Sequence, residues 1–117
     1  NVIKKDFSFL KGISFCGIAN PDFFVQTLQK QGIETKAHLS FKDHQKYDSG
    51  IIQKIEDMLK KNNETVFITT QKDWVKLPKD FIDKYNGFYL KFSISLPDES
   101  NFFWELEKKT LKFKSIN

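Results

Sequence analysis

The sequence predicts an α/β fold in three layers, with a mostly parallel sheet of about four strands and helices that alternate with them. Two observations support this fold class. Short apolar or alternating runs, typical of strands, are separated by segments in which apolar residues recur at helical spacing. The strand–helix pair also occurs four times in succession, which favours right-handed crossovers onto a parallel sheet. A chain of 117 residues is long enough for one domain with its own core.

The first predicted strand and helix occupy residues 13–32. The run ISFCGI, residues 13–18, has the apolar character of a short buried strand. In the following segment, NPDFFVQTLQKQG, Asn20 is suited to cap a helix, Pro21 to occupy its first position and Gly32 to end it. The apolar face of this helix is expected to consist of Phe23, Phe24 and Leu28.

The second strand and helix are predicted on either side of a polar loop. Residues 33–41, IETKAHLSF, alternate in the manner of a strand, and residues 49–63, SGIIQKIEDMLKKNN, are amphipathic. Asp48 or Ser49 is suited to cap this helix. The strand is expected to turn Ile33, Thr35, Ala37 and Leu39 to one side, and the helix to pack through Ile51, Ile52, Ile55, Met58 and Leu59.

The second half of the sequence repeats the pattern twice. Residues 64–70, ETVFITT, are apolar and β-branched, which favours a third strand. Residues 71–87 predict a helix broken at Pro78, and residues 88–96 predict a fourth strand. Residues 98–113, DESNFFWELEKKTLKF, predict a last helix, because the acidic residues at its start suit the positive end of a helix dipole.

The composition excludes several classes of protein. The single cysteine, Cys16, permits no intrachain disulfide and fits a reducing compartment. No apolar run approaches the roughly 18 residues of a membrane-spanning helix. The net charge is +4, and lysine supplies all 19 positive charges. Specific nucleic-acid recognition commonly relies on bidentate arginine contacts, so no nucleic-acid partner is expected. The lysines are explained by a solvated surface; the alternative is attraction to phosphates or to an anionic membrane surface.

Polar residues follow three of the predicted strands at their carboxyl ends, where ligands gather in parallel sheets. The first strand runs into GIANP, residues 17–21, in which Gly17 permits a tight turn. The helix that starts at Asn20 offers free N–H groups to an anion. The chain contains no G-x-x-x-x-G-K-[ST] loop. Taken alone, GIANP is also explained as a simple entry into the helix.

The second strand runs into FKDHQKY, residues 41–47. Imidazole ordinarily titrates near neutral pH, so a histidine at the carboxyl end of a strand is well placed for proton transfer. His44, with Asp43 beside it, is therefore a candidate for half of a proton-transfer site. The alternative is a polar surface loop. His38, which lies within the strand pattern, is expected to be structural.

The third strand runs into TTQKDWVKL, residues 69–77, and ends at Thr70. Lys72 at the start of a helix is suited to bind phosphate, and Asp73 is suited to cap the helix or to hold the lysine. The alternative is a helix cap beside a solvated lysine. The three polar clusters are expected to converge on one edge of the sheet, and together they are more informative than any one alone.

These three motifs, in this order and spacing, resemble those of the C-terminal domain of tetraacyldisaccharide 4′-kinase, the lipid A 4′-kinase of Gram-negative bacteria. The motifs of that family are approximately G-I-[GA]-[NH]-P, D-H-[HQ]-x-[FY] and T-E-K-D-A-V-K, and the resemblance covers about residues 10–107. Gln71 departs from the family's glutamate, and Trp74 departs from its small residue. The matching positions are Gly17, Ile18, Ala19, Asn20 and Pro21, then Asp43, His44, Gln45 and Tyr47, then Thr70, Lys72, Asp73, Val75 and Lys76.

The resemblance implies a fragment of a larger kinase. Residues 1–11 would be a linker or the end of a preceding interdomain element, and residues 12–117 would be the C-terminal α/β domain, with the P-loop domain absent. The full-length enzyme would transfer the γ-phosphate of ATP to the 4′-hydroxyl of a tetraacyldisaccharide 1-phosphate in lipid A biosynthesis. ATP and Mg²⁺ would be bound mainly by the P-loop domain. The fragment is therefore expected to hold no cofactor or metal and to be inactive alone.

The resemblance also implies roles for individual residues. His44 would pair with and tune an aspartate of the other domain, and Asp43 would orient the His44 ring or its loop. Substrate or phosphate contacts are expected at Lys72, Asn20 and Gly17, with support from Asp73, Thr70 and Gln45.

The partners implied by the resemblance are the P-loop domain, the lipid A precursor and the anionic surface of the inner membrane. The enzyme would be a monomer, bound peripherally on the cytoplasmic side, and the fragment itself would be soluble. Two other interpretations stay open. A stand-alone α/β module would bind a phosphate or nucleotide at GIANP and Lys72 without a second domain. A purely structural domain would tolerate alanine at His44.

Overall fold

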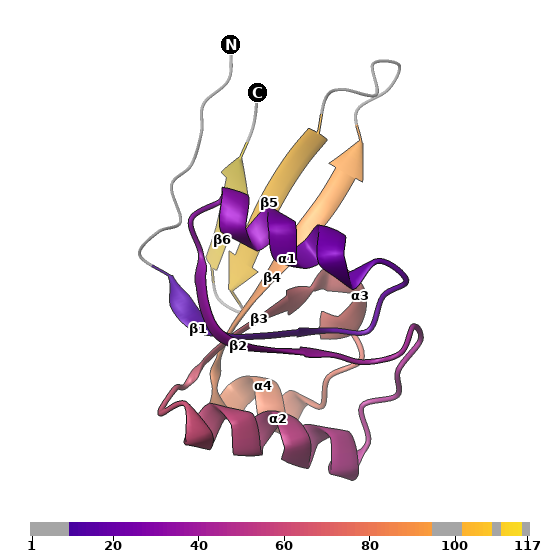
Figure 1. Ribbon diagram of the computed structural model, residues 1–117, viewed down its shortest axis with the longest axis vertical. Helices are drawn as coiled ribbons and strands as arrows, with labels where there is room; N and C mark the ends of the chain where they lie inside the picture. The colour runs from indigo at the N-terminus through magenta and orange to yellow at the C-terminus, as the bar shows by residue number, and fades with distance from the viewer. Residues whose placement is uncertain (1–9, 95–101, 109–110, 116–117) are drawn as a thin grey trace.

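The computed structural model describes residues 10–94, 102–108 and 111–115. These residues form a six-stranded sheet in the order β2-β1-β3-β4-β5-β6. Its first four members are parallel to one another, and helices lie on both faces (Figure 1), so the predicted three-layer α/β fold is confirmed. The strands are β1 (Lys11–Cys16), β2 (Glu34–Ser40), β3 (Val66–Thr70), β4 (Asn86–Ile94), β5 (Phe102–Lys108) and β6 (Leu111–Ser115).

The helices divide unequally between the two faces. They are α1 (Pro21–Lys30), α2 (Ser49–Lys61), α3 (Gln71–Trp74) and α4 (Lys79–Lys84). The chain steps from β1 to β2 in one direction along the sheet, and from β2 to β3 and on to β4 in the other. Right-handed crossovers therefore place α1 on one face and α2 and α4 on the opposite face, as Figure 1 shows.

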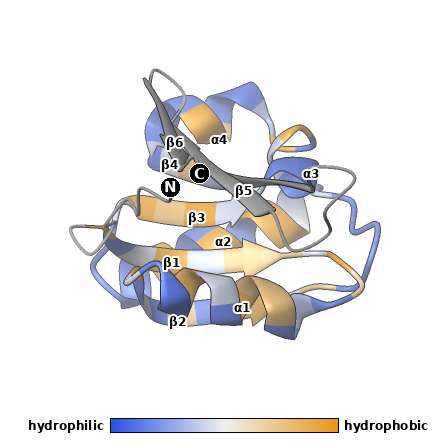
Figure 2. Cartoon of the chain, turned by 90° about the horizontal axis from the view of Figure 1, so that it is seen from above, coloured by the Kyte–Doolittle hydropathy of each residue, from blue (hydrophilic) through white to orange (hydrophobic). Residues whose placement is uncertain are grey.

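The core consists of two apolar clusters, one on each face of the sheet. In Figure 2, α1 alternates blue and orange along its length because only one side of this helix packs on the sheet. The cluster under α1 contains Leu10, Cys16, Phe24, Leu28, Ile33, Ile68, Phe88 and Leu90. The cluster under α2 and α4 contains Ile13, Phe15, Tyr47, Ile55, Leu59, Phe67, Leu77, Phe81 and Tyr85.

Most of the predicted helix limits are confirmed. The side chain of Asn20 caps α1 and that of Asp48 caps α2. Gly32, just after α1, has a φ of 78°, a left-handed conformation that glycine adopts without strain. The helix predicted over residues 71–87 is interrupted as expected, since α4 begins directly after Pro78. One detail was wrong: Phe24 is buried, but Phe23 is 41% exposed.

The predicted last helix, over residues 98–113, is wrong where the structure describes it. Residues 102–108 form β5, which pairs antiparallel with β4, and β6 pairs antiparallel with β5. In hindsight the sequence LKFKS of β6 alternates with period two, and FFWELEK of β5 is rich in aromatic residues, as strands are. The acidic residues 98–99 suggested a helix start, but they lie outside the described residues.

Replacing Asn20 with alanine is expected to destabilise the protein by about 1 kcal/mol, the usual loss of a helix cap. The Oδ1 atom of Asn20 accepts a hydrogen bond from the backbone N–H of Phe23 at 3.2 Å, and alanine leaves this donor without a side-chain acceptor. The denaturant midpoint should fall with an unchanged slope. Asn20→Asp is the control, because it keeps the acceptor; equal losses in both variants would contradict a capping role.

Candidate functional site at the carboxyl edge of the sheet

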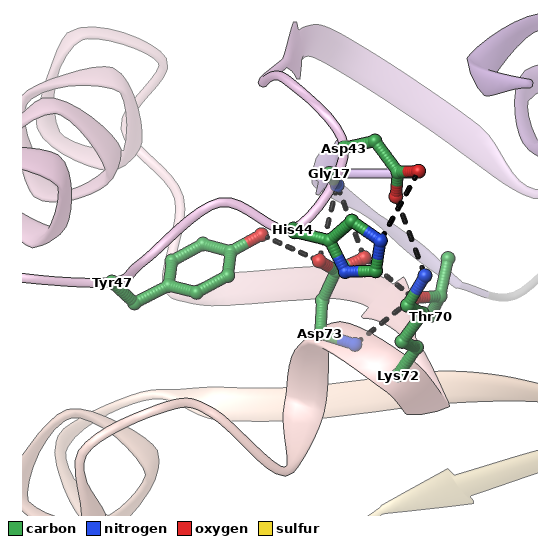
Figure 3. A network of polar contacts seen from close by, with 7 residues as sticks. All are labelled: Gly17, Asp43, His44, Tyr47, Thr70, Lys72 and Asp73. Atoms are coloured by element: carbon green, nitrogen blue, oxygen red, sulfur yellow. Dashed lines mark hydrogen bonds and ion pairs between the residues drawn. The ribbon is translucent and has the colours of Figure 1, made fainter. Parts of the chain in front are cut away.

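The loops that follow β1, β2 and β3 meet at the side chain of Asp73, which is completely buried. The backbone N–H of Gly17 lies 3.1 Å from each carboxylate oxygen, and the Tyr47 hydroxyl donates to Oδ1 at 2.8 Å (Figure 3). The Thr70 hydroxyl donates to Oδ2, while the Asp73 N–H donates to Thr70 Oγ1 at 3.1 Å. One carboxylate therefore holds together the three motifs that the sequence places far apart.

The environment of Asp73 also fixes the protonation state of its tyrosine partner. Burial raises the pKa of Tyr47, and the negative charge of Asp73 and the hydrogen bond to it raise this pKa further. Tyr47 therefore remains a hydroxyl donor at any physiological pH. Its ring packs against Phe15 and Phe41, with centroids 5.8 and 5.9 Å away, so the loop after β2 is held by both polar and apolar contacts.

Gly17 is required by close approach rather than by an unusual backbone conformation. A Cβ atom at this position would lie 2.9 Å from the carbonyl oxygen of Lys42, 3.0 Å from Cβ of Gln45 and 3.2 Å from Oδ1 of Asp73. Any side chain would therefore push the loops after β1 and β2 apart. The N–H of Gly17 is already donated to Asp73, so it is not available for the phosphate contact predicted from the sequence.

His44 lies where the sequence predicted, exposed in the loop after β2 and beside Lys72 on the carboxyl edge (Figure 3). Its side chain is 76% exposed, and Nε2 is 3.6 Å from Oδ2 of Asp43. Its φ of 63° is in the left-handed region, which is uncommon for a residue other than glycine. Such conformations persist only where neighbouring contacts enforce them, and they cluster at functional sites.

Asp43 links His44 to Lys72. Its Oδ1 atom lies 3.3 Å from the Lys72 ammonium group, which is itself about half exposed. Desolvation opposes the charged form of Asp43, but the hydrogen bond from Lys72 and the adjacent charges of His44 and Lys72 prevail and lower its pKa. The edge of the sheet therefore carries an imidazole, a carboxylate and an ammonium group in a row.

Some of the predicted site contacts differ in the structure. Asp73 was expected to cap α3 or to hold Lys72; instead Thr70 caps the helix and Lys72 pairs with Asp43. Asn20 uses its oxygen as a helix cap, and the Gln45 amide donates to the Lys46 carbonyl.

Sequence reasoning missed the role of Tyr47 as a partner of Asp73. The available signal was an aromatic residue in an otherwise polar loop, because a tyrosine there gains by burying its ring.

A second polar cluster lies on the α1 face around His38. Its Nδ1 is 2.7 Å from Oγ of Ser14, and its Nε2 is 2.9 Å from Oγ of Ser40 and 3.8 Å from Sγ of Cys16. Burial, followed by the charge of Asp73, raises the pKa of Cys16 to about 11, and burial lowers the pKa of His38. Both groups are therefore neutral at pH 7, and the cluster lacks the thiolate that nucleophilic catalysis needs.

The described residues contain no group of three or more His, Cys, Asp or Glu side chains placed to hold a metal ion. Within that same part of the chain, every helix is too short or too polar to cross a membrane.

Comparison with known proteins assigns the motifs to a family. A profile of the family described as tetraacyldisaccharide-1-P 4′-kinase matches residues 3–111. The chain belongs to this family. No solved structure matches the chain. The matched span includes all three motifs that meet around Asp73, and the family is the one that the sequence resembles.

Curated relatives with the name tetraacyldisaccharide 4′-kinase support this assignment. The protein of Desulfotalea psychrophila is 43% identical over 67 residues, which cover 57% of this chain and 19% of the relative. The protein of Halothermothrix orenii is 36% identical over 101 residues, which cover 80% of this chain and 26% of the relative. The protein of Pelagibacter ubique is 32% identical over 103 residues, which cover 88% of this chain and 31% of the relative. The chain thus spans between about a fifth and a third of the length of these relatives.

Proposed function

We propose that this chain is the C-terminal domain of an ATP-dependent tetraacyldisaccharide 4′-kinase. The complete protein would transfer the γ-phosphate of ATP to the 4′-hydroxyl of a tetraacyldisaccharide 1-phosphate in lipid A biosynthesis. Family membership supports the class of reaction. The observation that carries the role of this domain is the exposed imidazole of His44 at the carboxyl edge, beside the Asp43–Lys72 pair.

The geometry of His44 suits a group that acts through a partner. Its Nε2 is at ion-pair distance from Asp43, whereas Nδ1 has no hydrogen-bond partner within the described part of the chain. Phosphoryl transfer depends mainly on positioning and charge neutralisation, and the acceptor hydroxyl must also lose a proton. We assign the removal of that proton to an aspartate of the P-loop domain. His44 would hold this aspartate in place and tune its basicity.

Lys72 supplies positive charge beside the proposed proton-transfer pair. Its ammonium group is held at the edge of the sheet by Asp43 and stays about half exposed, so an incoming phosphate can share it. The main binding of ATP and Mg²⁺ is assigned to the P-loop domain of the complete protein. Lys72 would then neutralise part of the charge on the transferred group.

The site of action that fits this function is the cytoplasmic face of the bacterial inner membrane. The acceptor carries acyl chains, so the enzyme would meet it at a lipid surface as a peripheral monomer. The chain has a net charge of +4, and its lysines would be attracted to anionic lipid.

The 117-residue chain on its own is expected to show no kinase turnover. It contains no P-loop sequence, so it lacks the usual means of cradling the β- and γ-phosphates. The assay combines the chain with ATP, Mg²⁺ and the disaccharide acceptor, and the complete protein is the positive control.

Two results would contradict the proposal. Turnover by the chain alone in the range of roughly 1–100 s⁻¹ typical of kinases would show that no second domain is needed. Tight binding of inorganic phosphate or ATP to the chain alone would favour the stand-alone binding module. Because the Gly17 N–H is committed to Asp73, that module would have to use other donors.

A further inference from the structure

A pocket with a volume of about 260 Å³ opens on the α1 face of the sheet, at its carboxyl edge. It lies beside α1, which covers this face, whereas α2 and α4 cover the other, and Gln71 and Lys72 of α3 also line it. The apolar part of the lining comes from Ile18, Phe23, Phe24 and Leu90.

The polar residues of the lining are mostly committed to other partners. The Thr27 hydroxyl donates to the carbonyl oxygen of Phe23 at 2.7 Å, and the Thr70 hydroxyl donates to Asp73. The Lys72 ammonium bonds Asp43. Of the four polar lining residues, Gln71 alone has a side chain without a hydrogen bond inside the described structure. The pocket therefore offers mostly carbon surface, with one free amide and the half-exposed Lys72 ammonium among its polar residues, which suits a hydrocarbon chain with a polar head better than a sugar or a nucleotide base.

The pocket adjoins the proposed reaction centre. Thr70 and Lys72 belong to both, since Thr70 bonds Asp73 and Lys72 bonds the Asp43 carboxylate next to His44. An amphiphile with its chain in the pocket would therefore hold its polar head near His44. The volume is slightly below the roughly 300–1,000 Å³ of pockets that enclose whole drug-sized ligands, so a chain segment fits and a whole disaccharide does not.

We propose that this pocket binds one acyl chain of the acceptor lipid and so positions the acceptor hydroxyl at the His44 edge. This inference rests on the proposed function and adds a subsite to it. The acyl chain enters past Phe23, a residue that is 41% exposed although it lines the pocket. The inner wall is Leu90 on β4, next to Thr70 of β3 in the sheet. Burial of apolar surface supplies the affinity, and the polar rim sets the direction of the chain.

The first test measures acyl-chain dependence in the complete kinase. Acceptors with long and short acyl chains are compared by kcat/KM, and each methylene that enters the pocket should raise this value about fourfold. Ile18→Trp fills the pocket and should reduce the ratio of long-chain to short-chain kcat/KM at least tenfold. Val75→Trp is the matched control, because Val75 is 73% exposed and lies outside the lining. This variant should keep the wild-type ratio.

The second test separates the pocket from the reaction. Hexyl, octyl and decyl glucoside, each below its micelle concentration, are titrated into the 117-residue chain by calorimetry. From hexyl to octyl the affinity should rise about 15-fold, which is two methylenes at about fourfold each. Ile18→Trp should abolish this dependence, and Val75→Trp should retain it.

The outcomes are distinguishable. If the complete protein fails to phosphorylate the acceptor, the proposed function fails. If it phosphorylates the acceptor and Ile18→Trp leaves the chain-length ratio unchanged, the function stands and the acyl pocket is overturned. A rise in the KM for ATP alone in Ile18→Trp would assign the pocket to the nucleotide and also overturn the proposal. Alkyl glucoside affinity that is independent of chain length would do the same.

Discussion

His44→Ala in the complete kinase is expected to lower kcat by a factor of roughly 10²–10⁴, the usual contribution of a proton-transfer group. The imidazole stands at the carboxyl edge with its Nε2 near Asp43 and 76% of its side chain exposed. An exposed side chain with so few contacts contributes little to folding, so the thermal midpoint should stay close to that of the wild type. Activity and stability therefore separate at this position.

Two additional measurements test whether His44 acts through proton transfer. The pH–rate curve of kcat should lose one limb in His44→Ala, which a merely structural loss would not cause. Lys76→Ala is the companion variant, since Lys76 belongs to the same motif as Lys72 without being in the row of His44, Asp43 and Lys72, and a smaller loss is expected. Near wild-type turnover in a normally folded His44→Ala protein would mean that FKDHQKY is only a polar connection.

The parallel part of the fold could be predicted because its signals are local. Asn20 and Asp48 each accept a hydrogen bond from the backbone N–H three residues later. Pro78 interrupts the predicted helix because a proline in a helix interior removes a backbone donor and clashes with the preceding turn. The four parallel strands are short apolar runs, which periodicity detects. Nothing in these signals requires knowledge of distant residues, so the expected and observed elements agree from Lys11 to β4.

The antiparallel part could not be predicted from the same signals. Residues 98–113 combine acidic residues at the start with apolar spacing that fits a helix about as well as a strand. What decides the outcome is the free edge of β4, whose unpaired N–H and C=O groups accept β5 as a neighbour. Pairing with a strand edge is a long-range effect, and it overrides a weak local preference for helix.

The candidate site was predicted in outline, but its centre was misjudged. The topology rule brought GIANP, FKDHQKY and TTQKDWVKL to one edge, and the structure places them there. The sequence predicted that Asp73 caps the helix or holds Lys72, and it gave no sign of complete burial, which is rare for a carboxylate. Its burial depends on donors from Gly17 and Tyr47, which are 56 and 26 residues away in sequence.

Asp73→Ala is expected to destabilise the chain by roughly 2–5 kcal/mol. The substitution removes the acceptor of two buried donors, the Gly17 N–H and the Tyr47 hydroxyl, and each unsatisfied buried donor costs about 1–3 kcal/mol. Thr70 loses its acceptor as well. A loss of this size is a large part of the about 5–15 kcal/mol that stabilises a typical domain. Denaturant unfolding should show a much lower midpoint with a similar slope.

Tyr47→Phe separates the hydrogen bond from the carboxylate itself. This variant keeps the ring among Phe15 and Phe41 and removes one of the donors to Asp73, so a smaller loss of about 1 kcal/mol is expected. In the double variant Asp73→Ala/Tyr47→Phe, the total loss of stability should be smaller than the sum of the two single losses. Asp73→Ala alone leaves the Tyr47 hydroxyl buried without a partner, whereas the double variant has no hydroxyl there. Asp43→Ala is the control for removing a carboxylate, since Asp43 is partly exposed and should cost little. If Asp73→Ala costs no more than Asp43→Ala, the three loops are held together by their apolar contacts and not by the buried carboxylate.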